Sequence, residues 1–307
     1  MSARLDKFIT DNDLSGKNIT MSLLNLNGKD SLKCMEVRGG HGGAANFFKR
    51  PGLDVWIWSE SQRDTHSMSG DLHYITSCAS GRITRMIMSE VGGTANVFTD
   101  VAERMRDLMK RNINRIAQTT AVRQMSASLT TASDQGGFAS TLLCTYFAPL
   151  RSFTICNAGH PPPLLYRSTT DQWHILKSHI QSDQNQDENP SGNVLPQEYQ
   201  SLKLTLELGD MVLSYSNALT ECHLNNGQTL GVEGLRKLAR RLNQTCDSEY
   251  ALEELVSLIR SEHQDNLKND EATVMLSKVT HSRVSMRDNI LAPFRLARRS
   301  VSDRTSL

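Results

Sequence analysis

Short apolar and alternating runs dominate the sequence and predict a protein built mainly from β-strands. Residues 142–147 and 153–156 are apolar and rich in aromatic or β-branched side chains, and Pro149 lies in the turn between them. Gly159 and His160 then lead into three prolines, which lack backbone donors and stiffen the chain. We expect a rigid loop at the end of a core hairpin, followed by a third short strand. Such loops often carry binding or catalytic groups, although a purely structural loop is the alternative.

The same patterns predict further strands and three helical regions. Strands are expected at residues 19–24 and 32–37, joined as a hairpin by Asn27 and Gly28, and at 53–59, 69–78, 82–88, 172–176, 200–208, 211–215 and 272–279. Apolar residues recur at helical spacing over residues 96–129, 231–242 and 248–262. This order of strands and helical pairs predicts a β-sandwich covered by helices.

Composition narrows the class of protein. The chain has 307 residues, of which 38% are hydrophobic and 22% charged, and its formal net charge is +1. This balance argues against bulk binding of nucleic acid. We expect no membrane span, because no apolar run has the required length, and no secretory signal. The six cysteines form no Cys-x-x-Cys pair, so we expect reduced, buried thiols in a cytoplasmic protein.

Two acidic residues stand out because each lies beside glycine at the end of a predicted strand. Asp71 follows Gly70 near the start of one strand, and Glu90 comes just before Gly92 after the next. Carboxylates placed in this way commonly converge on a divalent cation. The alternative is a pair of solvated loop acids.

Five segments together resemble the PPM-type, metal-dependent serine/threonine phosphatases. The resemblance is closest to the SpoIIE-like or RsbU-like branch of bacterial sporulation and stress regulators. The segments are Ser-Gly-Asp at 69–71, Ser-Glu-Val-Gly-Gly at 89–93, Asn-Ala-Gly-His-Pro-Pro-Pro at 157–163, Gly-Asp-Met-Val-Leu-Ser-Tyr-Ser-Asn-Ala-Leu-Thr-Glu at 209–221, and Asp-Glu-Ala-Thr at 270–273.

The resemblance implies an α+β fold, a four-layer α-β-β-α sandwich in which two antiparallel sheets are flanked by helices. It places a phosphatase domain at residues 34–280, after an extension at 1–33 that could join the first sheet. Residues 281–307 are a basic tail that we expect to be disordered, with contact to an acidic partner or a membrane surface as the alternative. The resemblance also implies two Mn²⁺ or Mg²⁺ ions and a water bridging them that attacks a phosphoserine or phosphothreonine.

Carried over position by position, the resemblance assigns metal-binding and catalytic residues. Asp71, Glu90 and Asp270 would be catalytic acids. The metal ligands would be these three acids with the backbone carbonyl of Val91 and the side chain of Asn217. A loop beside the site, containing Asn157, Gly159 and His160, would meet the substrate.

Several residues depart from the family pattern. Glu90 and Asn217 stand where the family has aspartates, so one ligand is longer and another has lost its charge. Ala95 and Ala218 replace glycines. Glu271 could compensate for the lost charge, but as a strand residue it is expected to point away from the face that carries Asp270.

The resemblance implies hydrolysis of phosphoserine or phosphothreonine on a protein by a bacterial regulatory or partner-switching protein. The substrate would be a phosphoprotein, of the kind represented by an anti-sigma-factor antagonist. The alternative is a catalytically impaired pseudophosphatase that binds a phosphoprotein or another partner. A sandwich-fold binding protein unrelated to this family is a third hypothesis.

Overall fold

The computed structural model describes residues 46–60, 69–78, 81–92, 102–109, 122, 138–177, 201–244, 250–268 and 271–281. The strands in these ranges are β1 (Asn46–Arg50), β2 (Leu53–Glu60), β3 (Ser69–Cys78), β4 (Ile83–Gly92), β5 (Phe138–Phe147), β6 (Ser152–Ala158), β7 (Leu164–Arg167), β8 (Gln172–Ile175), β9 (Ser201–Thr205), β10 (Met211–Tyr215) and β11 (Ala272–Val279). The helices are α3 (Asn217–Glu221), α4 (Gly231–Ala239) and α5 (Ala251–Glu262), the 3-10 turns η2 (Ala148–Leu150) and η3 (Arg240–Gln244), and a helix over residues 102–109.

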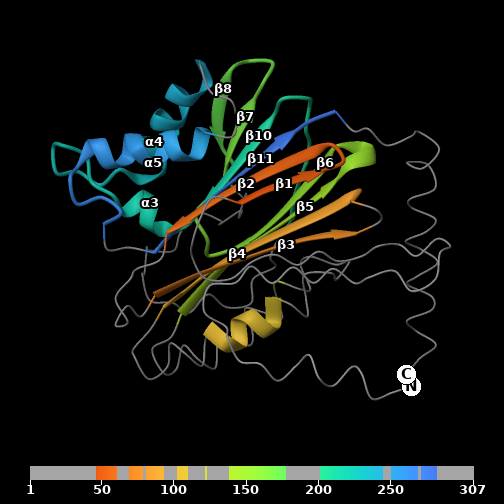
Figure 1. Cartoon of the computed structure of the whole chain (residues 1–307), viewed down its shortest axis with the longest axis horizontal. Helices are drawn as coiled ribbons and strands as arrows, with labels where there is room; N and C mark the ends of the chain where they lie inside the picture. The colour runs from red at the N-terminus through yellow and green to blue at the C-terminus, as the bar shows by residue number, and fades with distance from the viewer. Residues whose placement is uncertain are drawn as a thin grey trace, which may run out of the picture.

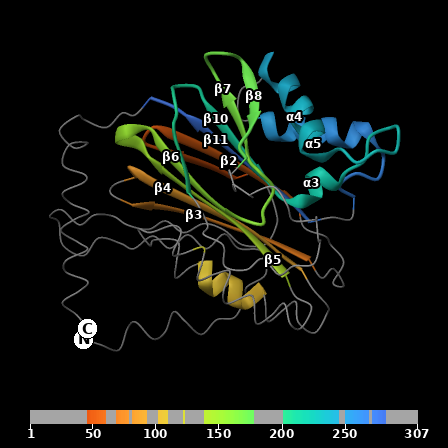
Figure 2. The same cartoon turned by 180° about the vertical axis from the view of Figure 1, so that it is seen from behind.

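These strands form two antiparallel sheets that face one another (Figures 1 and 2). The six-stranded sheet has the order β1-β2-β11-β10-β7-β8, and the five-stranded sheet has the order β3-β4-β5-β6-β9. Apolar side chains from both sheets share one buried cluster, to which β2 contributes Val55, β4 Met86 and β11 Met275. This cluster is the core between the two sheets.

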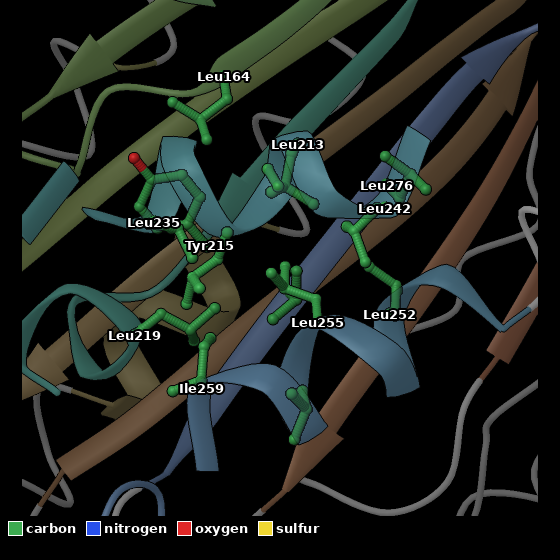
Figure 3. Close-up of a cluster of buried hydrophobic side chains, with 14 of the residues drawn as sticks. Leu164, Leu213, Tyr215, Leu219, Leu235, Leu242, Leu252, Leu255, Ile259 and Leu276 are labelled. Carbon is green, nitrogen blue, oxygen red and sulfur yellow. The ribbon is translucent and has the colours of Figure 1, made fainter. Parts of the chain in front are cut away.

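Helices cover the outer faces of both sheets. On the six-stranded sheet, Leu235 of α4 and Leu255 of α5 point into a cluster with Tyr215 of β10 (Figure 3). On the five-stranded sheet, Met105 and Met109 of the helix over residues 102–109 pack against residues of β3, β4 and β5. Figure 1 shows this helix, in yellow, below β3 and β4. The predicted four-layer α-β-β-α sandwich is therefore confirmed.

Most predicted strands are confirmed, three of them with the expected bounds: β3, β10 and β11. The prediction for β4 ended too early, because the strand continues through Gly92 and so contains Glu90. β1 was not predicted. The predictions for residues 1–45, the extension included, and those for the tail at 282–307, Ala95 and Asp270 lie outside the described residues.

The prediction of reduced core thiols can be checked against the described part of the chain. There, Cys144, Cys156 and Cys222 are buried and form no disulfide, as expected for reduced core thiols. Among the described helices, none is long and apolar enough to cross a membrane.

A buried acid fixes the strand that leads into the candidate site. Asp210, at the start of β10, is fully buried and accepts hydrogen bonds from the backbone N–H groups of Glu207 and Ser168 and from Nη1 of Arg167 at 2.8 Å. The same Nη1 donates to the carbonyl of Thr205 in β9, at 3.0 Å. This network anchors β10, of the six-stranded sheet, to β9 of the other sheet.

Candidate functional site

Strand register brings the two predicted acids together. Asp71 of β3 lies directly opposite Glu90 of β4 in the antiparallel ladder. Two residues along each strand from these acids, on the same faces, lie His73 and Met88, and Met88 belongs to the core between the sheets. Both carboxylates therefore lie on the inner face of the five-stranded sheet, at the rim of the sandwich.

Asn217 approaches Glu90 from the other sheet. β10 ends at Tyr215, and after Ser216 the chain turns into the short helix α3, which begins at Asn217. The backbone N–H of Asn217 donates to Oε2 of Glu90 at 3.1 Å. Burial raises the pKa of Glu90, the Asn217 backbone N–H opposes this shift, and the negative charge of Glu221 adds to it.

Glu271, which the sequence analysis set aside, contacts Asp71; its orientation relative to Asp270 concerns a residue outside the described ranges. It lies immediately before β11, and its Oε2 accepts a hydrogen bond of 3.1 Å from the backbone N–H of Asp71. Burial raises the pKa of Glu271, while this hydrogen bond and the positive charge of Arg106 act in the opposite direction.

The Asp71 carboxylate is buried among groups of the same charge. Burial raises its pKa to about 8; the hydroxyls of Ser216 and Thr273 favour the ionised form, and the charges of Glu90 and Glu271 oppose it. Among the described residues, its Oδ2 is buried and has no hydrogen-bond partner. A buried polar atom of this kind needs a proton, a water or a cation beside it.

Two more polar atoms without a partner lie near this carboxylate. His73 is two residues along β3, and Ser140 of β5 is the register partner of Glu90. Within the described part of the chain, Nδ1 of His73 and Oγ of Ser140 are also buried without a hydrogen bond. Burial lowers the pKa of His73 to about 4, so its ring is neutral near neutral pH. The inner rim of β3, β4 and β5 therefore holds several unsatisfied polar atoms.

These residues fit a hard divalent cation in donor type. Asp71, Glu90 and Asn217 offer oxygen atoms, which Mg²⁺ and Mn²⁺ prefer, and Val91 lies in β4 beside Glu90. In the ranges that the structure describes, no three His, Cys, Asp or Glu side chains are grouped closely enough to hold a metal ion. With Asp270 outside those ranges, the fit extends to the Asp71–Glu90 pair, and the full ligand set remains a prediction.

The Asn157–His160 loop lies at the same rim. Thr141 of β5 pairs with Ala158, and a Cβ built on the next residue, Gly159, would lie 3.9 Å from Cβ of Ser140. Gly159 is exposed and adopts a φ of +72°, which favours glycine. The loop therefore starts one strand away from Glu90.

Internal hydrogen bonds hold this loop rigid. The Asn157 side chain accepts a bond from the backbone N–H of His160 at 2.9 Å and donates one to its carbonyl at 2.8 Å. The Tyr215 hydroxyl donates to the carbonyl of Pro162 at 2.7 Å. Burial lowers the pKa of His160 to about 4, so this side chain is a neutral core group. Gly159 is therefore the residue of the loop that is most exposed to a ligand.

Sequence reasoning missed Ser216 and Glu221 and set Glu271 aside. Ser216 joins the end of β10 to the neighbouring strand β11. Its backbone N–H donates to the carbonyl of Thr273, and its Oγ accepts the N–H of Thr273 at 3.0 Å. Its place directly before Asn217 in the Gly-Asp segment was the available signal. Glu221 lies one helical turn after Asn217.

Sequence comparison establishes the family. Residues 86–280, more than half of the chain, match the family described as Stage II sporulation protein E (SpoIIE), so the chain belongs to the SpoIIE family. No curated protein sequence gives a significant match.

Solved structures of low sequence identity share the fold. The RsbU and RsbW domains of a Mycobacterium tuberculosis protein match with a TM-score of 0.57 at 16% identity, over 76% of this chain and 62% of that one. The phosphatase domain of SpoIIE from Bacillus subtilis, with a fragment of its regulatory domain, gives 0.57 at 12% identity, over 81% and 70%. RsbX in complex with magnesium gives 0.52 at 12%, over 77% and 100%. The chain thus has the PPM phosphatase fold and spans 62% of the first of these structures.

Proposed function

We propose that this protein hydrolyses phosphoserine or phosphothreonine on a protein, in a reaction that requires Mn²⁺ or Mg²⁺. The observation that carries the proposal is the pairing of Asp71 with Glu90 at the rim of the sandwich, with Oδ2 of Asp71 buried and unpartnered among the described residues. Membership of the SpoIIE family and the PPM fold support it.

Asp71, Glu90, Asn217 and Asp270 would hold the cation, with the carbonyl of Val91. When bound, a divalent cation neutralises phosphoryl charge and lowers the pKa of a water, which supplies a hydroxide near neutral pH. Without the cation, any ionised carboxylate of this group of acids (Asp71, Glu90 and Glu271) repels a phosphate dianion, so phosphate binding should depend on the cation.

The remaining contacts preorganise the acids. Glu271 fixes the backbone at Asp71, and the N–H of Asn217 fixes the carboxylate of Glu90. Both bonds join one sheet to the other, so the ligand oxygens are held by two rigid layers rather than by loops. Gly159, exposed and one strand away, would leave room for the phosphorylated segment of the substrate.

The substrate class follows from the RsbU-like resemblance. We infer a bacterial regulatory phosphoprotein, with an anti-sigma-factor antagonist as the best representative.

A catalytically impaired pseudophosphatase is the second candidate, and specific observations favour it. Asn217 lacks the charge of the family's aspartate, and Oε2 of Glu90 already accepts the N–H of Asn217. At an effective dielectric of about 20, a unit charge at ~4 Å is worth ~4 kcal/mol before solvent screening, so its loss weakens cation binding strongly. Such a protein would hold no cation at Asp71 and Glu90 and would bind its partner through another part of its surface.

Hydrolysis of a phosphopeptide with millimolar Mn²⁺ separates the two candidates. We expect turnover in the wild type, higher turnover in Asn217→Asp because the charge is restored, and none in Asp71→Ala. Turnover only in Asn217→Asp, or only when Glu90→Asp is added, would establish the impaired protein. If Asp71→Ala is as active as the wild type, the site assignment is wrong.

A further inference from the structure

A second polar pocket lies at the far end of α3 from Asn217. Its volume is about 490 Å³, and its lining includes Glu221, His223, His263, Asp265 and Asn266. The residues come from the end of α3, the segment that follows it, and the segment after α5. The phosphatase mechanism uses none of these side chains as ligands, so the pocket needs its own explanation.

Two imidazole rings line this pocket close to one another. The ring centroids of His223 and His263 lie 6.1 Å apart, and the ring planes are inclined by 50°. Two histidines bound to one ion at a metal–nitrogen distance of roughly 2.0–2.1 Å place their ring centroids about 5 Å apart at a tetrahedral angle and roughly 6.4 Å apart when both nitrogens lie in line with the metal. The observed separation lies between these limits, so a tetrahedral ion would require the two side chains to rotate towards one another.

A buried asparagine fixes the two segments that carry these rings. The Oδ1 of Asn266 accepts the backbone N–H of His223 at 2.8 Å, and its Nδ2 donates to the carbonyl of His223 at 2.9 Å. The same Nδ2 donates to the carbonyl of Ile259 in α5 at 2.8 Å. Asn266 is 4% exposed. The distance between the rings is thus set by a hydrogen-bonded core rather than by two independent surface loops.

We propose that His223 and His263 form a site for a borderline transition-metal ion of the Zn²⁺ class. Imidazole nitrogen suits Zn²⁺, Ni²⁺ and Cu²⁺, whereas the oxygen ligands around Asp71 suit Mg²⁺ and Mn²⁺. The site is therefore chemically distinct from the candidate catalytic site. It also stands independently of the proposed phosphatase activity.

Asp265 completes the environment of His263. Its backbone N–H donates to Nδ1 of His263 at 3.3 Å, and its Oδ2 lies 4.0 Å from the same nitrogen. Binding of an ion to Nε2 would move the ring proton to Nδ1, which then could no longer accept the N–H of Asp265. Oδ2 of Asp265 would have to move closer than its present 4.0 Å to accept that proton, as outer-shell acids do in histidine metal sites. No third side chain of the metal-binding types completes a ligand set in the described ranges, so water from the open pocket would fill the other positions.

Glu221 links this pocket to the candidate catalytic site. It lines the pocket and lies at the end of α3, whose first residue is Asn217. A cation held by the two histidines would lie near Glu221 and offset part of its charge.

Titration calorimetry of the full chain with zinc chloride, in millimolar Mg²⁺, tests the proposal. We expect a one-to-one binding step in the wild type. The step should weaken by on the order of tenfold or more in His223→Gln and in His263→Gln, because each removes one of two protein ligands. It should persist in Asp71→Asn, which alters only the carboxylate site.

His174→Gln is the matched control, because His174 is an exposed histidine of β8 that lies outside the pocket. It should leave the step unchanged, and circular dichroism should show that all variants are folded. Crystals soaked in zinc should give an anomalous peak between the two rings. Wild-type zinc binding in His223→Gln and His263→Gln, or a peak only elsewhere, would overturn the proposal.

Discussion

His160 shows how a residue of a predicted substrate loop serves the fold. Its ring is buried, and Nδ1 lies 3.3 Å from the carbonyl of Pro161. Burial lowers its pKa to about 4, well below its ordinary value. The Asn157 side chain holds its backbone on both sides. The sequence predicted that this loop is rigid, but it could not separate the buried histidine from the exposed Gly159.

The buried ring predicts a measurable dependence of stability on pH. The folded protein binds fewer protons than the unfolded chain between pH ~6.5 and about 4, so the contribution of His160 to the free energy of unfolding falls as the pH falls through this window. We expect the stability advantage of the wild type over His160→Gln to shrink by about 2 kcal/mol between pH 7 and pH 5. Urea denaturation at the two pH values measures it. A difference that does not depend on pH would contradict the prediction.

At the scale of elements, α3 is capped by the opposite sheet. Ser216 precedes the helix but makes no side-chain cap, because its Oγ accepts the N–H of Thr273 instead. Glu90 of β4 takes the first N–H of the helix, that of Asn217. An acid at a helix N-terminus is favourable for hydrogen bonding and for charge. The longer side chain at position 90 therefore has a structural role that the family's aspartate pattern did not suggest.

Two substitutions of Glu90 separate the effect of this hydrogen bond on stability from the effect of the carboxylate charge. In chelator, we expect Glu90→Ala to be less stable than Glu90→Gln by about 1 kcal/mol, because only glutamine keeps an acceptor for the Asn217 N–H. Both variants should lose the stabilisation by Mn²⁺ that we expect for the wild type. Urea denaturation with and without Mn²⁺ measures both effects. Equal stabilities of the two variants in chelator would show that the bond does not support α3.

Strands were more predictable than their ends and contacts. β10 and β11 were predicted with their observed bounds because buried strands in this chain are continuous apolar runs between turn residues. The prediction for β4 stopped before Glu90 because Ser89, Glu90 and Gly92 are weak strand formers, whereas pairing on both sides overrides that preference. The role of Glu271 depends on contact across two sheets, which no local pattern contains.

At the scale of the whole molecule, polar bonds tie the two sheets together at separate places. At the rim, Glu90 and Glu271 accept backbone N–H groups from opposite sheets. At the start of β10, Arg167 and Asp210 link β7, β9 and β10. Family resemblance assigned Asp71 and Glu90 to one site, and in the strand register they lie opposite each other. Asp270, the third acid predicted for this site, lies outside the described ranges, so its place there stays a prediction.

The rim acids predict opposite effects of one substitution on stability with and without metal. Asp71 is a buried carboxylate near Glu90 and Glu271, and its Oδ2 has no partner among the described residues. Asp71→Asn keeps the shape and removes the charge, so in chelator we expect a higher melting temperature than that of the wild type, by the equivalent of a few kcal/mol. A residue kept for binding rather than for stability shows this trade-off.

Mn²⁺ should reverse the order of the two melting temperatures, so that the wild type melts above Asp71→Asn. At a cation concentration about 100 times Kd, binding stabilises the wild type by ~2.7 kcal/mol, and Asp71→Asn should gain little. Calorimetric melting of both proteins in chelator and in Mn²⁺ gives the four values required. If Asp71→Asn is destabilised in chelator, the carboxylate is satisfied by contacts within the protein. If Mn²⁺ shifts both proteins equally, the cation binds elsewhere, and the rim acids are then a structural junction between the sheets.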